Sequence, residues 1–186
     1  MTAAQLDTIQ LAEGGHHDPE AGLCLLEAVA YVAGERHSDH PTCTSPVLGT
    51  FGRSLNDVLP DELRQGLKPL IPQLIGTRGD GHDETRSLLA LDWLIRTWLP
   101  AWLQLAHLDD EARELRELAQ IVDGETAQAA GPLVRAAQTK AFEKRRAAWA
   151  AARAAARDVL APTVTELQRS AIDIYRRMAT IGSADA

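Results

Sequence analysis

The sequence is poor in the residues that favour β-strands. Its 186 residues include 4 Trp, 2 Tyr and 2 Phe, and 16 valines and isoleucines together, against 31 alanines and 25 leucines. Strands prefer β-branched and aromatic side chains, whereas alanine and leucine have high helix propensity. This composition excludes a mainly β protein. It predicts an all-α fold, with a compact head of short helices and long alanine-rich C-terminal helices that form a hairpin or an arm.

Long apolar runs are also missing. Runs such as 88–90 and 147–152 fall far short of the roughly 20 residues that span a bilayer, and no basic stretch followed by an apolar run opens the chain. We therefore expect no membrane span and a cytoplasmic location. With 45% hydrophobic and 24% charged residues, the composition is that of a folded globular protein.

Basic residues are scarce in the first 130 residues. That part contains 9 Lys and Arg and 21 Asp and Glu, a net charge of -12, whereas residues 131–186 contain 10 and 5, a net charge of +5, which together give -7. We therefore divide the chain into an acidic helical head, 1–130, and a basic alanine-rich tail, 131–186, that packs on the head or extends from it. Nucleic acid is an unlikely partner for a mainly acidic surface.

Prolines and glycines mark the expected helix ends. We expect helices over 18–33, starting at Asp18-Pro19, and over 46–58, then brief helical turns up to Gly76 and a loop at 77–82. A longer helix starts at Asp83 and is kinked at Pro100, with Trp93, Trp98 and Trp102 in the core. Further helices are expected over 110–122, with Gly124 closing it, from Pro132 to about 161, and from Pro162 to about 181.

Cysteine and histidine are concentrated in one short segment. Both cysteines and four of the six histidines lie within residues 16–43. The pattern Cys-x2-Glu-x9-His-x2-His-x2-Cys contains the donor types that zinc prefers, and a turn in the loop can bring them together. We predict a metal-binding protein, with zinc held by the side chains Cys24, His37, His40 and Cys43. Glu27, on the same helix face as Cys24, is either a fifth ligand or orients a ligand.

Other interpretations of this segment remain open. If the metal site leaves a position for water, Glu27 is the candidate general base of a hydrolase. Without a metal, Cys24 is a small core residue, and His37 and His40 are surface-loop residues. A disulfide between Cys24 and Cys43 is a further alternative.

Cys24 is also a candidate nucleophile, because Gly22-Leu23-Cys24 lies near an expected helix N-terminus, where a thiolate is stabilised. His37, His40 or His82 would then act as the base. This layout resembles that of papain-like and transglutaminase-like enzymes. Those enzymes carry their later catalytic residues on β-strands, for which this sequence has no pattern.

Arginines beside a helix and a glycine-flanked loop suggest a second site. Arg53, Asn56 and Asp57 lie together on the expected second helix, and Arg78 lies in the loop before His82. Such residues bind anions such as phosphate, as a cofactor or substrate group. The alternative is that they form salt bridges and helix caps, since no nucleotide-binding motif is present.

The tail carries a basic stripe with an aromatic residue, formed by Arg146, Trp149, Arg153 and Arg157. Such a stripe suits nucleic acid or an anionic protein surface. We favour docking on the acidic part of the same chain, or self-association that makes a homo-oligomer through the C-terminal helices. A non-enzymatic interaction protein, with a partner bound by this helix, is thus the alternative function.

Residues 14–106 contain a series of short motifs, namely Gly14-Gly15-His16, Gly22-Leu23-Cys24-Leu25-Leu26-Glu27-Ala28-Val29-Ala30-Tyr31, Ala33-Gly34-Glu35, Ser38-Asp39-His40-Pro41-x-Cys43-x-x-Pro46-Val47, Phe51-x-Arg53-x-x-Asn56-Asp57, Leu70-Ile71-Pro72, Gly76-Thr77-Arg78 and Asp92-Trp93-Leu94-Ile95-Arg96. Through these motifs the chain resembles a family of uncharacterised proteins from actinobacteria and their phages. In the family an alanine-rich tail of variable length follows, with repeats of the Asp-Ala-Ala-Arg kind. The resemblance implies a His/Cys-rich head joined to such a tail and no particular reaction.

Overall fold

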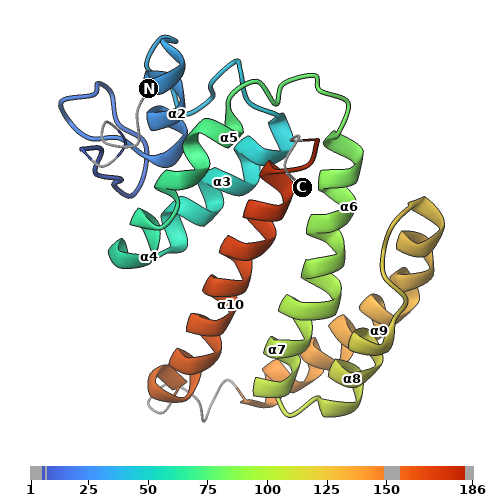
Figure 1. Cartoon of the computed structure of the whole chain (residues 1–186). Helices are drawn as coiled ribbons and strands as arrows, with labels where there is room; N and C mark the ends of the chain where they lie inside the picture. Colours follow the sequence, from blue (N-terminus) through green and yellow to red (C-terminus); the bar gives the residue numbers. More distant parts are fainter. Residues whose placement is uncertain (1–5, 7, 149–155, 183–186) are drawn as a thin grey trace. The chain divides into compact units, whose positions relative to one another are not determined.

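The structure is a computed structural model that describes residues 6, 8–148 and 156–182. Every regular element in these ranges is helical (Figure 1), and the one β feature is an isolated bridge between Leu11 and Leu23. The elements are α2 (Leu25–Ala33), α3 (Pro46–Val58), α4 (Asp61–Gln65), the 3₁₀ turn η1 (Lys68–Leu70), α5 (Ile71–Leu74), α6 (Asp83–Trp93), the π-helical turn η2 (Leu94–Trp98), α7 (Leu99–Leu105), α8 (Asp109–Glu117), α9 (Gly124–Ala148) and α10 (Ala156–Ala179). The all-α prediction is confirmed.

The chain forms two compact units that are each built from their own contacts. The first comprises Met1–Arg86 and Ala171–Ala186, and the second comprises Ser87–Ser170. Helices α6 and α10 contribute residues to both. The bounds of these two units differ from the predicted division at residue 130, which was based on charge. The division into an acidic head and a basic tail stays a prediction.

The first unit packs around α2. Residues Leu25 to Ala30 are all buried, and Leu48 and Leu55 of α3 join them in the core. The C-terminal end of α10, red in Figure 1, belongs to the same core. There the hydroxyl of Tyr175 donates to the carbonyl of Leu48 at 3.1 Å. This unit therefore needs residues from both ends of the chain.

Helix α2 begins later than its sequence predicts. The start at Asp18 is wrong, because Asp18 opens a turn over 18–21 in which its Oδ1 accepts the N–H of Ala21 at 2.8 Å. Gly22 follows with φ of 141°, a conformation that no helix can continue. The helix starts instead at Leu25, with Cys24 as its N-cap, and it ends as predicted at Gly34, where φ is 72°. Helix α3 has the predicted bounds, with Ser45 as N-cap and Pro46 in the first turn.

In the second unit, the helix predicted to kink at Pro100 contains a π-helical turn just before that proline. The turn before Pro100 widens into the π-helix η2, so Pro100 falls in the first turn of α7, where its missing N–H costs little. Trp93 is buried and its Nε1 donates to Ser170 Oγ at 2.7 Å. Trp98 is 37% exposed, so its assignment to the core is wrong.

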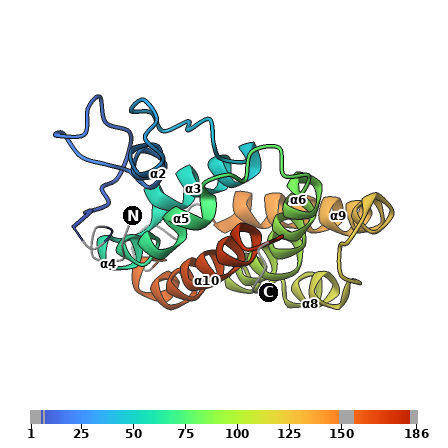
Figure 2. The same cartoon turned by 45° about the horizontal axis from the view of Figure 1, so that its top comes forward.

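Helices α8 and α9 (yellow to orange in Figure 2) also differ from the expected bounds. Helix α8 ends at Glu117, and Gly124 opens α9 instead of closing the preceding helix. The reason is a reciprocal cap, in which Thr126 N donates to Asp123 Oδ1 at 2.8 Å and Asp123 N donates to Thr126 Oγ1 at 3.1 Å. Pro132 lies inside α9, and Pro162 inside α10.

The basic stripe predicted for the tail lies outside the part of the chain whose side chains the structure describes. Trp149 and Arg153 lie outside the described residues, as do the side chains of Arg146 and Arg157. A basic residue of the tail, Lys140 of α9, forms an ion pair with Glu111 of α8 in the acidic part of the chain. A homo-oligomer through the C-terminal helices stays a prediction. Within the described ranges, no helix combines the length and the apolarity that crossing a bilayer requires.

Candidate functional site

The carboxylate of Glu27 is the centre of a polar cluster at the N-terminal end of α2. The residue is 1% exposed. It forms a capping box with Cys24, in which Glu27 N donates to Cys24 Sγ at 3.5 Å and Cys24 N donates to Glu27 Oε2 at 2.7 Å. The usual Ser or Thr of this motif is replaced by a cysteine, so a thiol lies beside the carboxylate.

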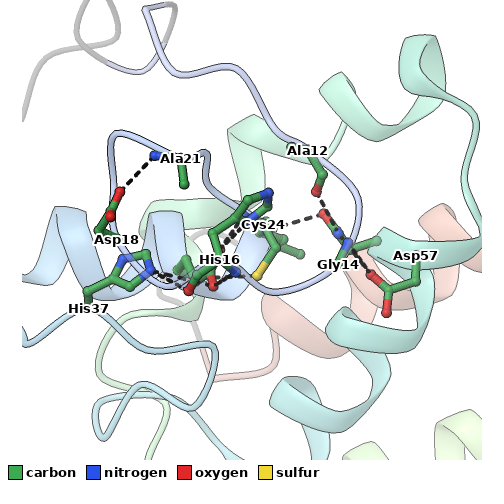
Figure 3. A network of polar contacts seen from close by, with 11 residues as sticks. Ala12, Gly14, His16, Asp18, Ala21, Cys24, His37 and Asp57 are labelled. Atoms are coloured by element: carbon green, nitrogen blue, oxygen red, sulfur yellow. Dashed lines mark hydrogen bonds and ion pairs between the residues drawn. The ribbon is translucent and has the colours of Figure 1, made fainter.

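Two histidines complete the cluster (Figure 3). Nδ1 of His16 lies 2.8 Å from Glu27 Oε2, and the backbone N–H of His16 donates to Oε1 at 2.6 Å. Nε2 of His37 lies 2.9 Å from the carbonyl oxygen of His16 and 3.6 Å from Glu27 Oε1. Two imidazoles and one thiol therefore meet at a single carboxylate, and we call His16, Cys24, Glu27 and His37 the Glu27 cluster.

Burial and hydrogen bonding set the protonation of this cluster. Burial by itself would raise the pKa of Glu27, but donors from Cys24 and His16 bring that pKa below its usual value. Burial, together with the Glu27 charge, raises the pKa of the Cys24 thiol to about 12. The carboxylate is therefore charged and the thiol protonated at neutral pH. A cysteine nucleophile requires the opposite, a lowered thiol pKa.

The predicted zinc ligands fall in different places. Cys24 and His37 belong to the Glu27 cluster. His40 is exposed, and its Nδ1 pairs with Asp39 Oδ1 at 2.6 Å. Cys43 lies near Glu35, beyond the other end of α2, where burial and then the Glu35 carboxylate raise the pKa of its thiol. Cys24 is the N-cap of α2, whereas Cys43 interacts with Glu35, which follows the C-cap Gly34 at the other end of the helix. Both cysteines are free thiols.

A ready-made metal site is not present in the described part of the chain. No three or more His, Cys, Asp or Glu side chains there have the arrangement that holds a metal ion. The four-ligand zinc site therefore stays a prediction.

His16 is the member of the cluster that sequence reasoning missed. It precedes α2 by nine residues, and no helical or strand periodicity links it to Glu27. Its position depends on Gly22, because a Cβ on that glycine would lie 2.7 Å from Cδ2 and Nε2 of the His16 ring. The signal available in the sequence was the concentration of histidines in residues 16–43 together with the glycine.

The residues predicted to bind an anion mostly hold backbone groups. Arg53 Nη1 donates to the carbonyl of Asp39 at 3.0 Å. Asn56 is fully buried, with Nδ2 donating to the carbonyl of Ala12 at 2.9 Å, and Asp57 Oδ1 accepts the N–H of Gly14 at 3.1 Å. Arg78 is exposed. These contacts are structural hydrogen bonds to loop backbone, and both the anion site and its alternative of salt bridges and helix caps stay predictions.

No protein-family model matches this chain, and no curated protein or solved structure is significantly similar to it. The likeness to actinobacterial and phage proteins therefore stays a prediction.

Proposed function

We propose that this protein binds a zinc ion at the Glu27 cluster, with His16, Cys24, Glu27 and His37 as ligands. The observation that carries the proposal is the approach of two imidazole nitrogens to one buried carboxylate, at 2.8 and 3.6 Å. Imidazole, thiolate and carboxylate are the donor types that zinc takes in proteins, and four such groups complete a tetrahedral site. The proposal keeps three residues of the predicted pattern and replaces His40 and Cys43 by His16.

Two of the donor-to-donor distances are near those of a zinc site, although the four side chains as described do not form one and would have to move to hold the ion. Zinc holds nitrogen and oxygen ligands at about 2.0 to 2.2 Å, so two ligand atoms of a tetrahedral site lie about 3.3 Å apart. The two nitrogen-to-oxygen distances of the cluster, 2.8 and 3.6 Å, lie on either side of that value. A zinc ion bound here would take the place of the hydrogen bond between His16 and Glu27.

Metal binding at this point changes the protonation of the cluster. The Cys24 thiol, whose pKa burial raises to about 12, has to lose its proton to become a ligand. Zinc binding is therefore expected to release protons and to weaken as the pH falls. We assign Glu27 as a ligand rather than a general base, because its side chain is 2% exposed and a base needs to reach a water molecule or a substrate.

Three matched pairs of variants test the ligand set. Within each pair the first residue belongs to the Glu27 cluster and the second is a residue of the same type outside it: Cys24→Ser and Cys43→Ser, His37→Gln and His40→Gln, His16→Gln and His17→Gln. Cys24→Ser keeps a good N-cap, so the helix start is preserved while the thiolate is removed. Zinc affinity is measured by competition with a chromophoric chelator, and the zinc content by elemental mass spectrometry.

We expect about one zinc ion per chain in the unmodified protein. Each cluster variant should weaken zinc binding by more than about 10-fold, since even loss of an orienting partner costs that much. The three neighbouring variants should bind zinc as the unmodified protein does. Absence of zinc binding by the unmodified, folded protein overturns the proposal. So does a result in which, within each pair, the control variant weakens zinc binding as much as the cluster variant does.

A further inference from the structure

The side chains of the Glu27 cluster are largely closed off from solvent. That of Glu27 is 2% exposed, and those of His16 and His37 are 14% and 16% exposed. Cys24 is also buried. The two imidazoles are therefore the members of the cluster that solvent reaches, and an ion from solution has to pass beside them. Groups on that side of the cluster determine how fast the ion enters.

An exposed pair of side chains, Asp39 and His40, lies in the loop that carries His37. The two side chains are 38% and 66% exposed, and Nδ1 of His40 lies 2.6 Å from Asp39 Oδ1. A carboxylate on one ring nitrogen is the arrangement that orients the other ring nitrogen of a histidine toward a metal ion. That other nitrogen, Nε2 of His40, makes no hydrogen bond to the part of the chain that the structure describes. We call Asp39 and His40 the outer pair.

Asp39 and Glu27 face the same point in space, beside Gly15. A Cβ on Gly15 would lie 3.7 Å from Glu27 Oε1 and 4.0 Å from Asp39 Oδ2. Outside residues 14–16, no other described atom lies within 4 Å of that point. Carboxylate oxygens on two sides of an open point attract a cation to it. The Gly15 position therefore lies between the exposed carboxylate and the buried one.

Hydrogen bonds hold the loop of the outer pair in place. Arg53 Nη1, on α3, donates to the carbonyl of Asp39 at 3.0 Å. The backbone N–H of His40 donates to Ser38 Oγ at 3.0 Å. Both residues of the pair are thus fixed through their backbone, which leaves their side chains to bind an ion.

The ring of His37 also has a nitrogen that is not used. Its Nε2 lies 2.9 Å from the carbonyl oxygen of His16, whereas its Nδ1 is buried and has no hydrogen-bond partner in the described ranges. Buried polar atoms are nearly always paired, and an ion is one of the groups that satisfies one that is not. The loop 37–40 therefore offers two imidazole nitrogens to an ion, Nδ1 of His37 and Nε2 of His40.

We propose that the outer pair captures zinc at the surface and passes it beside Gly15 to the Glu27 cluster. This inference rests on the zinc site proposed above and adds the route by which its ion enters and leaves. One imidazole and one carboxylate provide half of the ligands of a complete tetrahedral site, so the outer pair holds the ion more weakly than the cluster does. A group that contacts the ion only during transfer changes the rates of entry and exit by the same factor. The outer pair therefore sets the rate of zinc exchange and not the affinity.

Zinc exchange in the full-length protein tests this route. Uptake is followed with a chromophoric chelator that reports the zinc left in solution, and release is followed after zinc-loaded protein is mixed with excess chelator. We expect Asp39→Asn and His40→Gln each to slow both steps by about 10-fold and to leave the equilibrium affinity for zinc unchanged. His17→Gln is the matched control, because His17 is an exposed histidine whose Nε2 pairs with a carboxylate, Asp18 Oδ2, at 2.9 Å. It should exchange zinc at the rates of the unmodified protein.

Gly15→Ala tests the route without removing a ligand. Its methyl group would lie between the two carboxylates at ordinary contact distances, so we expect slower uptake and release with unchanged affinity and stability. Exchange at the unmodified rates in this variant overturns passage beside Gly15.

The outcomes separate this inference from the zinc site on which it rests. Zinc that binds the cluster and exchanges at the unmodified rates in Asp39→Asn and His40→Gln overturns the route and leaves the zinc site standing. Equal slowing by His17→Gln overturns the route as well. A lower equilibrium affinity in His40→Gln also overturns it, because His40 would then hold the bound ion. Absence of zinc binding by the unmodified protein overturns the zinc site itself.

Discussion

The imidazole of His16 is joined to the carboxylate of Glu27 through Nδ1 and Oε2, 2.8 Å apart, across eleven residues of sequence. The backbone N–H of His16 reaches the other carboxylate oxygen at 2.6 Å. One buried acid therefore orients a histidine and fixes the loop that carries it. Charge-assisted hydrogen bonds of this kind are about twice as strong as neutral ones.

Glu27→Gln should destabilise the protein by about 1.5 to 3 kcal/mol at neutral pH, because hydrogen bonds to a charged acceptor are lost. The hydrogen bonds from Cys24 and His16, acting against burial, hold the pKa of Glu27 below its usual value. The stabilisation is therefore complete above the unfolded pKa, about 4.3, and disappears as the pH falls through the folded pKa. Urea unfolding between neutral pH and pH 3 measures it, with exposed Glu20→Gln as control. A difference from the unmodified protein that does not shrink with acid contradicts this explanation.

The Cys24 thiol should not react with a thiol reagent while the protein is folded. Its side chain is buried, and that burial raises its pKa to about 12. In the Cys43→Ser variant, a chromogenic disulfide reagent at neutral pH is expected to react only at the rate of unfolding. Fast modification of this variant without denaturant shows that Cys24 is accessible and ionised, against our assignment.

Gly22→Ala should displace His16 from the cluster and cost about 1 to 3 kcal/mol, from steric overlap. The new Cβ would lie 2.7 Å from the imidazole, and φ of Gly22 is 141°. Gly15→Ala is the matched control, since its Cβ would lie 3.7 Å from the nearest atom, Glu27 Oε1. Thermal unfolding and the imidazole NMR signals of both variants distinguish them. Equal stability and unchanged His16 signals in both variants would remove Gly22 from our explanation.

Gly52→Ala should weaken the contact between α3 and the C-terminal end of α10. Its Cβ would meet the Tyr175 hydroxyl, which donates to the Leu48 carbonyl. We expect a loss of about 1 to 3 kcal/mol in unfolding free energy by denaturant titration. In the same helix, a Cβ at Gly49 would lie 3.4 Å from Nη1 of Arg53, at the end of a flexible side chain. Gly49→Ala should therefore leave the stability unchanged or raise it. If Gly49→Ala is the more damaging of the two, the packing described for Tyr175 is incorrect.

Local signals in the sequence predicted much of the fold. Ser45-Pro46 and Gly34 act through short-range capping, so the start of α3 and the end of α2 could be placed correctly. Asp18-Pro19 carries an equally good start signal, but the conformation of Gly22 breaks the helix before it can form. Likewise, the sequence predicted a helix start at Pro132, but the reciprocal cap of Asp123 and Thr126 starts α9 earlier, at Gly124.

The candidate site was predicted only in part, because its geometry depends on long-range contacts. Cys24 and Glu27 share a helical turn, so their proximity follows from helix periodicity. His16 and His37 reach the same carboxylate from loops on either side of α2, and no periodic pattern encodes such an approach. Cys43 looked equivalent to Cys24 in the sequence, yet Cys24 caps the start of α2 and Cys43 interacts with Glu35 beyond its end.

X-ray absorption at the zinc edge of the zinc-loaded protein tests the ligand assignment most directly. We predict one sulfur at about 2.3 Å and three nitrogen or oxygen ligands at about 2.0 to 2.2 Å. The sulfur should disappear in Cys24→Ser and stay in Cys43→Ser. A sulfur that persists in Cys24→Ser, or a first shell of nitrogen and oxygen alone in the unmodified protein, would contradict a metal site at the Glu27 cluster.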